Sequence, residues 1–258
     1  MQLRYLGDSH DYIKFALLRH MQQALDLRIG VNWYLTDAEN NGDGEQRRYL
    51  DKPEWERLDK ALLEKLRPFL LPEYRTLENF ERGGILPKET LYYKCKVSSK
   101  DRRSSWHQQA LTALSQAQLV FLDQDNGFEV PSMTDRTQAK YAFYEEAFDY
   151  YEQGKIVVGI QFARQCDPVV RGRQVRENLI QSSGSSADFP IVRGRVSPNI
   201  LFLLVSPSDR AKKVGEALET FAAKSPVLKG SRCVSGIVFR QGRLAVCRAG
   251  IRTGARRQ

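Results

Sequence analysis

The sequence lacks the features of a membrane-spanning or exported chain. No apolar run approaches the roughly 18 residues that span a bilayer, and the opening segment MQLRYLGDSHDYIK is charged throughout. It also lacks a C-x-x-C pair, because Cys95, Cys166, Cys233 and Cys247 are widely spaced. That spacing argues against a zinc knuckle or a redox pair. We therefore expect a cytoplasmic chain without membrane contacts, whose cysteines are reduced, half-buried hydrophobic residues on strands.

Acidic residues are missing after Glu219. Nine basic residues follow it and equal the formal net charge of +9: Lys224, Lys229, Arg232, Arg240, Arg243, Arg248, Arg252, Arg256 and Arg257. A cationic end suits a polyanion such as RNA or DNA, because each phosphate contact releases counterions. Candidate nucleic-acid contacts are Arg240, Arg243, Arg248 and Arg252. The alternative is a basic tail that only keeps the chain in solution.

Apolar segments alternate with helical patterns along the chain. Strands are predicted at 29–36, 90–97, 119–123, 156–162 and 199–206, and helices at 9–27, 53–67, 72–82, 101–117, 134–153, 168–182 and 208–223. This alternation predicts an α/β fold with an open, mostly parallel Rossmann-like sheet and helices on both faces. The segment 236–248 predicts an antiparallel C-terminal hairpin. We expect one domain, 1–248, and a basic tail, 249–258, for which disorder is one interpretation.

Two of the predicted strands end in polar clusters. Ligands of open parallel sheets bind outside the carboxyl ends of the strands. Asp37 closes the first strand and is followed by the Gly42-Asp43-Gly44 turn, which suits close backbone approach to a ligand or is an ordinary surface turn. The second cluster, Asp123-Gln124-Asp125-Asn126, directly follows the apolar run LVFL. It places candidate catalytic groups at the rim of a rigid scaffold, or else Asp123 caps backbone amides and the segment turns at Gly127.

A third cluster opens the first predicted helix. Gly7-Asp8-Ser9-His10-Asp11 precedes Lys14, one turn inside. The amino end of a helix attracts anions, and Lys14 would reinforce that attraction. The alternative is an ordinary capped helix whose polar residues face solvent.

In this order, the three clusters resemble the J-type ribosomal RNA adenine-N6 methyltransferases. The likeness runs loosely over residues 5–206. That family has an N-terminal G-N-x-x-D-x-x-K-H segment, of which this chain keeps Gly7, Asp11 and Lys14. The family's D-x-x-x-G-x-G is similar to the segment from Asp37 to Gly44, with one residue inserted. Its catalytic D-P-P-Y stands where this chain has Asp123, Gln124, Asp125 and Asn126, without the prolines or the aromatic residue.

The resemblance implies a class I methyltransferase-like sheet that uses S-adenosylmethionine on a nucleic-acid base. It implies a donor site at Lys14, Asp37, Gly42 and Gly44. It also implies catalysis by Asp123, Asp125 and Asn126, with Phe128 as a stacking face for a flipped base.

Two other functions stay open at this point. One is a Mg²⁺-dependent nuclease, with oxygen ligands drawn from Asp37, Glu39, Asp43, Asp123, Asp125 and Glu129. The other is a non-catalytic protein that keeps the sheet and binds nucleic acid or a protein partner.

Overall fold

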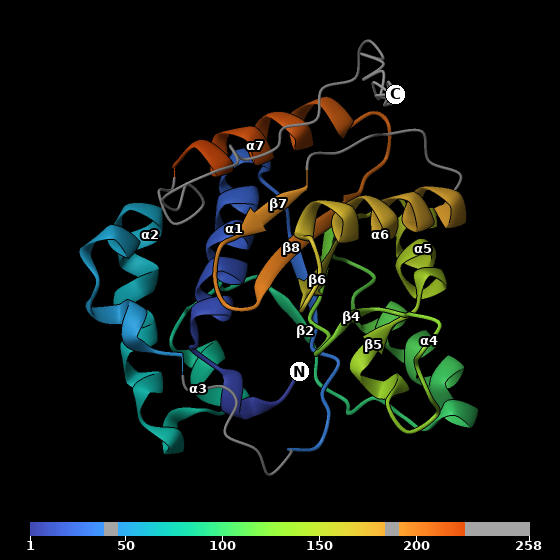
Figure 1. Cartoon of the computed structure of the whole chain (residues 1–258), viewed down its shortest axis with the longest axis horizontal. Coiled ribbons are helices and arrows are strands. Elements are labelled where there is room, and N and C mark those ends of the chain that lie inside the picture. Colours follow the sequence, from blue (N-terminus) through green and yellow to red (C-terminus); the bar gives the residue numbers. More distant parts are fainter. Residues whose placement is uncertain (39–45, 184–190, 225–258) are drawn as a thin grey trace, which may run out of the picture.

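The computed structural model describes residues 1–38, 46–183 and 191–224. Its main sheet has six strands in the order β2-β1-β3-β6-β8-β7, of which Figure 1 labels β2, β6, β8 and β7. Their bounds are β1 Ile29–Asn32, β2 Leu91–Tyr93, β3 Leu119–Leu122, β6 Ile156–Ala163, β7 Val192–Gly194 and β8 Asn199–Val205. The first four strands of this order are parallel, and β8 runs antiparallel to both of its neighbours. The predicted α/β class with a mostly parallel sheet is confirmed.

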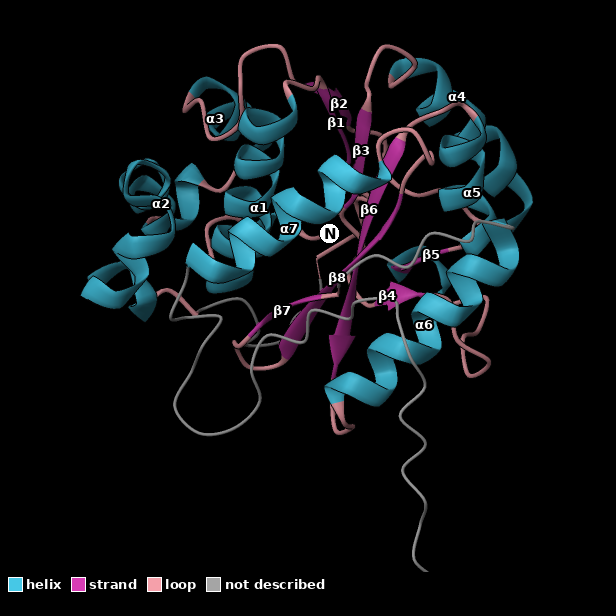
Figure 2. Ribbon diagram, turned by 90° about the horizontal axis from the view of Figure 1, so that it is seen from above, coloured by secondary structure: helices cyan, strands magenta, loops and turns pink. Residues whose placement is uncertain are grey.

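Helices cover both faces of this sheet (Figure 2). One face packs against α1 Ser9–Leu25, α2 Pro53–Leu66, α3 Leu77–Arg82 and α7 Ala211–Lys224, and the other against α4 Arg103–Ala113, α5 Tyr144–Glu152 and α6 Pro168–Ser183. Each face has its own hydrophobic core. Every residue of β1 and β3 is buried, as expected for parallel strands between two helical layers. None of the described helices is both long and apolar enough to cross a membrane.

The region predicted as one helix over 134–153 contains three elements instead. They are a 3-10 turn, η6 Gln138–Lys140, the short strand β5 Tyr141–Ala142, and α5. β5 pairs in parallel with β4 Gly127–Phe128. The backbone N–H of Phe143 donates to the carboxylate of Glu146, which caps the helix and fixes its start at Tyr144. The helical prediction was therefore wrong before residue 143.

The prediction that the cysteines are half-buried on strands was wrong for the two cysteines that can be examined. Cys95 and Cys166 are free but exposed, and each lies just beyond the end of its strand. Cys233 and Cys247 lie outside the described residues, as do the predicted hairpin at 236–248 and the domain boundary at residue 248. Within the described chain, the antiparallel edge is made by β8 and β7.

A buried ion pair ties α4 to α5. Arg103 holds Glu146 with two hydrogen bonds, Nε to Oε1 at 2.5 Å and a terminal nitrogen to Oε2 at 2.9 Å. The hydroxyl of Tyr34, from the segment after β1, also donates to this carboxylate. The network fixes the segment after β1 against both helices, beside the carboxyl edge of the sheet.

We expect Glu146→Gln to lower the free energy of unfolding by about 3 kcal/mol, because it leaves Arg103 buried without a counter-ion. Urea denaturation measures this loss. Glu78→Gln is the matched control, since Glu78 pairs with Arg82 on the exposed surface, and it should cost less than about 0.5 kcal/mol. Equal losses in the two variants would contradict the role given to the buried pair.

Candidate functional site

A cavity of about 1110 Å³ opens at the carboxyl edge of the sheet. We call it the Lys14 cavity. It lies where β3 and β6 end and where β7 turns into β8, with the start of α1 forming one wall. The position agrees with the rule that open parallel sheets bind ligands at this edge.

The lining of the Lys14 cavity is cationic. Six basic side chains face three acidic ones: Lys14, Arg48, Lys52, Lys140, Arg164 and Arg195 against Asp8, Asp123 and Asp125. Apart from Lys14, the basic residues come from four separate segments: η2 Arg48–Asp51 with Lys52, η6, the end of β6, and the β7–β8 turn. Aromatic side chains, among them Tyr5 and Phe162, also line the cavity. A phosphate-bearing ligand suits this combination.

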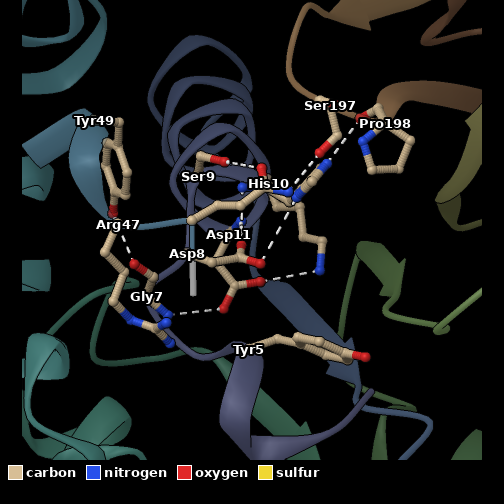
Figure 3. Close-up of polar contacts among 12 residues, drawn as sticks. Tyr5, Gly7, Asp8, Ser9, His10, Asp11, Arg47, Tyr49, Ser197 and Pro198 are labelled. Atoms are coloured by element: carbon tan, nitrogen blue, oxygen red, sulfur yellow. Dashed lines mark hydrogen bonds and ion pairs between the residues drawn. The ribbon is translucent and has the colours of Figure 1, made fainter. Parts of the chain in front are cut away.

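The start of α1 is fixed by local hydrogen bonds. The Asp8 carboxylate caps the helix by accepting from the backbone N–H groups of His10 and Asp11, at 2.8 and 2.9 Å (Figure 3). Gly7 has a φ of +79°, and a Cβ there would lie 2.5 Å from the Cβ of Phe69. Glycine is therefore required immediately before this cap.

Lys14 joins α1 to the end of β3. Its ammonium donates to Asp11 Oδ1 at 3.0 Å and to Asp123 Oδ1 at 2.8 Å, and all three side chains are buried. Burial alone would lower the pKa of Lys14, but the carboxylates of Asp123 and Asp11 raise it overall. Lys14 is therefore a fixed positive charge at the floor of the cavity.

Two acceptors at the floor have no hydrogen-bond partner among the described residues. They are Oδ2 of Asp123 and Oε1 of Gln124, and both residues line the cavity. The amide nitrogen of Gln124 donates to the carbonyl of Ile160 at 3.0 Å, which fixes the orientation of the side chain. A buried acceptor without a partner costs about 1–3 kcal/mol, so these oxygens are candidate contacts for a water molecule or a ligand.

Asp125 and Asn126 also line the cavity. Asp125 is held by the Met1 ammonium at 3.1 Å and by hydrogen bonds from Thr36 and Gln2. Burial raises the pKa of Asp125, but the ammonium and these hydrogen bonds outweigh that effect and lower it overall. The backbone N–H of Asn126 donates to the carbonyl of Lys140. The structure thus brings the three predicted catalytic residues into one cavity with Lys14.

The predicted donor residue Asp37 does not join them. Although its neighbour Thr36 contacts Asp125, the exposed Asp37 side chain pairs with Lys96 and does not line the cavity. Leu35 forms a β-bridge to Lys96, which follows β2. In the sheet, β2 and β3 lie on opposite sides of β1. The side chain of Asp37 is therefore directed away from Asp123.

Other predicted residues lie elsewhere. Phe128, the candidate stacking face, is buried and stacks on Tyr144 with ring centroids 5.2 Å apart, so it is not available to a base. Glu129 accepts a hydrogen bond from the backbone of Tyr144. The residues outside the described part of the chain are Glu39, Gly42, Asp43, Gly44, Arg240, Arg243, Arg248 and Arg252. No group of three or more metal-binding side chains occurs in the described ranges.

Sequence reasoning missed the β7–β8 turn and its contacts with α1. His10, which gave no signal alone, bonds through Nε2 to the carbonyl of Pro198 at 2.9 Å (Figure 3). Gln46 donates to the carbonyl of Ser197 at 2.7 Å. The basic lining residues were missed as well, because they are dispersed between positions 48 and 195 among acidic residues. Only the fold brings them together.

Comparison with known proteins gave no match to a family model, a curated protein or a solved structure. The site is therefore interpreted from its geometry.

Asp11→Asn should change how stability depends on pH. Burial is the main cause that raises the pKa of Asp11, from 3.8 to about 7. Between these values the folded protein holds a proton that the unfolded chain releases, so rising pH disfavours folding. Relative to Asp11→Asn, the wild type should lose up to about 1.4 kcal/mol per pH unit between about pH 4 and 7, and nothing further above pH 7.

Denaturation of both proteins across this pH range measures the difference. Asp51→Asn, at an exposed carboxylate, is the control and should show no such slope. A constant difference between wild type and Asp11→Asn at every pH would contradict the assignment.

Proposed function

We propose that the chain is a methyltransferase-like protein that binds nucleic acid in the Lys14 cavity and directs an amino group of a base to Asp123 and Gln124. The observation that carries the proposal is the pair of unpartnered acceptors at the floor of a cationic cavity. An exocyclic amine has two N–H donors and suits two such oxygens, whereas a keto oxygen in that place would face them without a hydrogen bond.

The charges support a ligand with phosphates at the mouth and an amine at the floor. Arg48, Lys52 and Arg164 are exposed at the cavity, where contact with phosphates releases counterions. Tyr5 and Phe162 are half-buried there and offer faces on which a base can stack. Because both acceptor oxygens are buried, ligand entry requires small movements of the side chains at the floor.

The sheet is consistent with this proposal at the coarse level. Four parallel strands with helices on both faces and an antiparallel pair at one edge agree with the class I, Rossmann-like architecture that the resemblance implies. Under the proposal, the Lys14–Asp123 pair joins the segment resembling the family's N-terminal motif to the segment that replaces its catalytic motif.

The described residues do not assemble the expected S-adenosylmethionine site. Lys14 lies in the cavity and is already bound to two carboxylates, while Asp37 lies outside it and pairs with Lys96. We therefore derive no step through the donor. Titration calorimetry with S-adenosylmethionine, with and without bound oligonucleotide, tests this part. Heat of binding supports methyl transfer, and its absence in both states restricts the proposal to nucleic-acid binding.

The amine-reading role predicts a preference among bases. Single-stranded RNA with adenine should bind at least about tenfold more tightly than the same strand with unsubstituted purine, which lacks the amino group, because the hydrogen bonds to the charged Asp123 and to Gln124 are both lost. Asp123→Asn should abolish this preference. Fluorescence anisotropy measures both affinities.

Asp37→Asn is the matched control, since it makes the same chemical change at a strand-end aspartate outside the cavity. It should retain the preference. A wild type that binds both strands equally, or an Asp123→Asn variant that still prefers adenine, would contradict the proposal. Mg²⁺-dependent cleavage of the strand would instead favour the nuclease alternative.

A further inference from the structure

Asp11 is a buried carboxylate that reaches the cavity only through Lys14. Its Oδ2 accepts the backbone N–H of Gly7 at 3.1 Å, and its Oδ1 accepts the ammonium of Lys14 at 3.0 Å. Asp11 itself does not line the Lys14 cavity. Any influence of its charge on a ligand must therefore pass through the position and the hydrogen bonds of Lys14.

The buried cluster around Lys14 carries more negative than positive charge. Asp8, Asp11 and Asp123 are all buried, and Lys14 is the ammonium that Asp11 and Asp123 share. Carboxylates gathered in a low-dielectric site cannot all stay ionised without cost, so one of them tends to hold a proton.

The surroundings select Asp11 as the group that holds this proton. Burial works against the charge of Asp8 too, but His10 and the capped backbone N–H groups lower its pKa overall. At Asp11, burial outweighs the attraction of Lys14, and the charges of Asp8 and Asp123 add to the rise of its pKa to about 7.

Besides Asp125, three other titratable groups face this cluster. His10 lies beside Asp8, with Nδ1 at 3.7 Å from its carboxylate. The Met1 ammonium interacts with Asp125 and Asp123, and burial lowers its pKa. Tyr49 stays neutral, because burial and the nearby Asp8 and Asp11 raise its pKa well above the ordinary value. Of these groups, His10 and the Met1 amine are the nitrogen bases that lie beside carboxylates of the cavity, at Asp8 and Asp125.

We propose that Asp11 is a positioning residue that takes up a proton when the phosphates of a ligand bind at the mouth of the Lys14 cavity, and that this proton redirects the Lys14 ammonium toward the bound ligand. The inference rests on the proposed function, because it needs a phosphate-bearing ligand in the cavity. The negative charge that the phosphates add to the cavity disfavours the Asp11 carboxylate and draws a proton from solvent. The protonated carboxyl has lost one acceptor position, so its contact with Lys14 weakens.

Lys14 is able to respond to this change. An ammonium has three N–H donors, and two of them are used by Asp11 and Asp123. When Asp11 is protonated, the ammonium has one carboxylate counter-ion in place of two. The N–H donors of Lys14 that no longer bind Asp11 can then donate to the ligand, and the positive charge that Asp11 no longer neutralises attracts it.

Calorimetry of an adenine-containing single-stranded RNA tests this directly. Phosphodiesters do not titrate near neutral pH, so proton uptake on binding reports the protein. At pH 7.5, titrations in PIPES and in Tris should differ in heat by an amount that corresponds to ~0.5 proton taken up per strand, and affinity should fall about threefold as the pH rises from about 7 to 8. Equal heats in the two buffers, with binding intact, would overturn the inference and leave the proposed function standing.

Two variants identify the group that takes up the proton. Asp11→Asn should bind without proton uptake, whereas His10→Gln should still take up a proton. Loss of uptake in His10→Gln, or uptake that persists in Asp11→Asn, would overturn the inference. If Asp11→Asn does not fold, the wild-type buffer comparison and His10→Gln still decide between the two groups. No binding in any buffer would overturn both the inference and the proposed function.

Discussion

The buried contact between Lys14 and Asp123 is the interaction on which the rest of the site depends. It joins α1 to the residue directly after β3, across 109 positions of sequence. The ammonium nitrogen of Lys14 lies 2.8 Å from Oδ1 of Asp123. Removing the Lys14 ammonium would leave two buried carboxylates, Asp11 and Asp123, without their counter-ion, and the loss of one partner from a buried pair costs several kcal/mol. The contact therefore fixes the N-terminus of α1 over the end of β3 and defines the floor of the cavity.

Charge varies with depth in this cavity. The floor contains carboxylates that outnumber their ammonium, and the mouth carries basic residues from four segments. Such an arrangement favours ligands that carry an amine at one end and phosphates at the other, because the carboxylates at the floor stabilise the amine and the basic residues at the mouth stabilise the phosphates. The contacts of His10, from α1, and of Gln46, just before η2, hold the β7–β8 turn in place, and with it Arg195. The same edge of the sheet therefore supplies both the scaffold and the charge pattern.

Much of the fold and part of the site could be predicted from the sequence. The apolar run LVFL followed by Asp123 predicted a buried strand with a polar end, and β3 does end immediately before Asp123. The polar residues at the start of the first predicted helix suit a helix cap, and of Asp8 and Ser9 it is Asp8 that caps it. These predictions succeeded because each depends only on residues that are neighbours in the sequence. A run of apolar side chains marks a strand, and a polar residue next to it marks a strand end or a helix cap.

The predictions that failed depend on contacts between distant segments. Nothing local to Asp37 shows that Leu35 pairs beside Lys96, which turns the Asp37 side chain away from Asp123. The start of α5 depends on Glu146, whose carboxylate is fixed by Arg103 from another helix. The basic lining residues share no motif, and the net charge directed attention to the C-terminal residues instead. Basic residues that come from four separate segments give no signal in the linear sequence.

Photo-cross-linking tests the central claim most directly, namely that the Lys14 cavity is where this protein meets nucleic acid. A single-stranded RNA carrying a photoreactive nucleoside is irradiated in complex with the full chain, and the cross-linked peptides are identified by mass spectrometry. The account predicts cross-links to peptides that contain Tyr5, Phe162 or the β7–β8 turn, all of which line the cavity. Cross-links confined to peptides outside the cavity, such as the exposed segment of Lys94 and Lys96 beside β2, would contradict it.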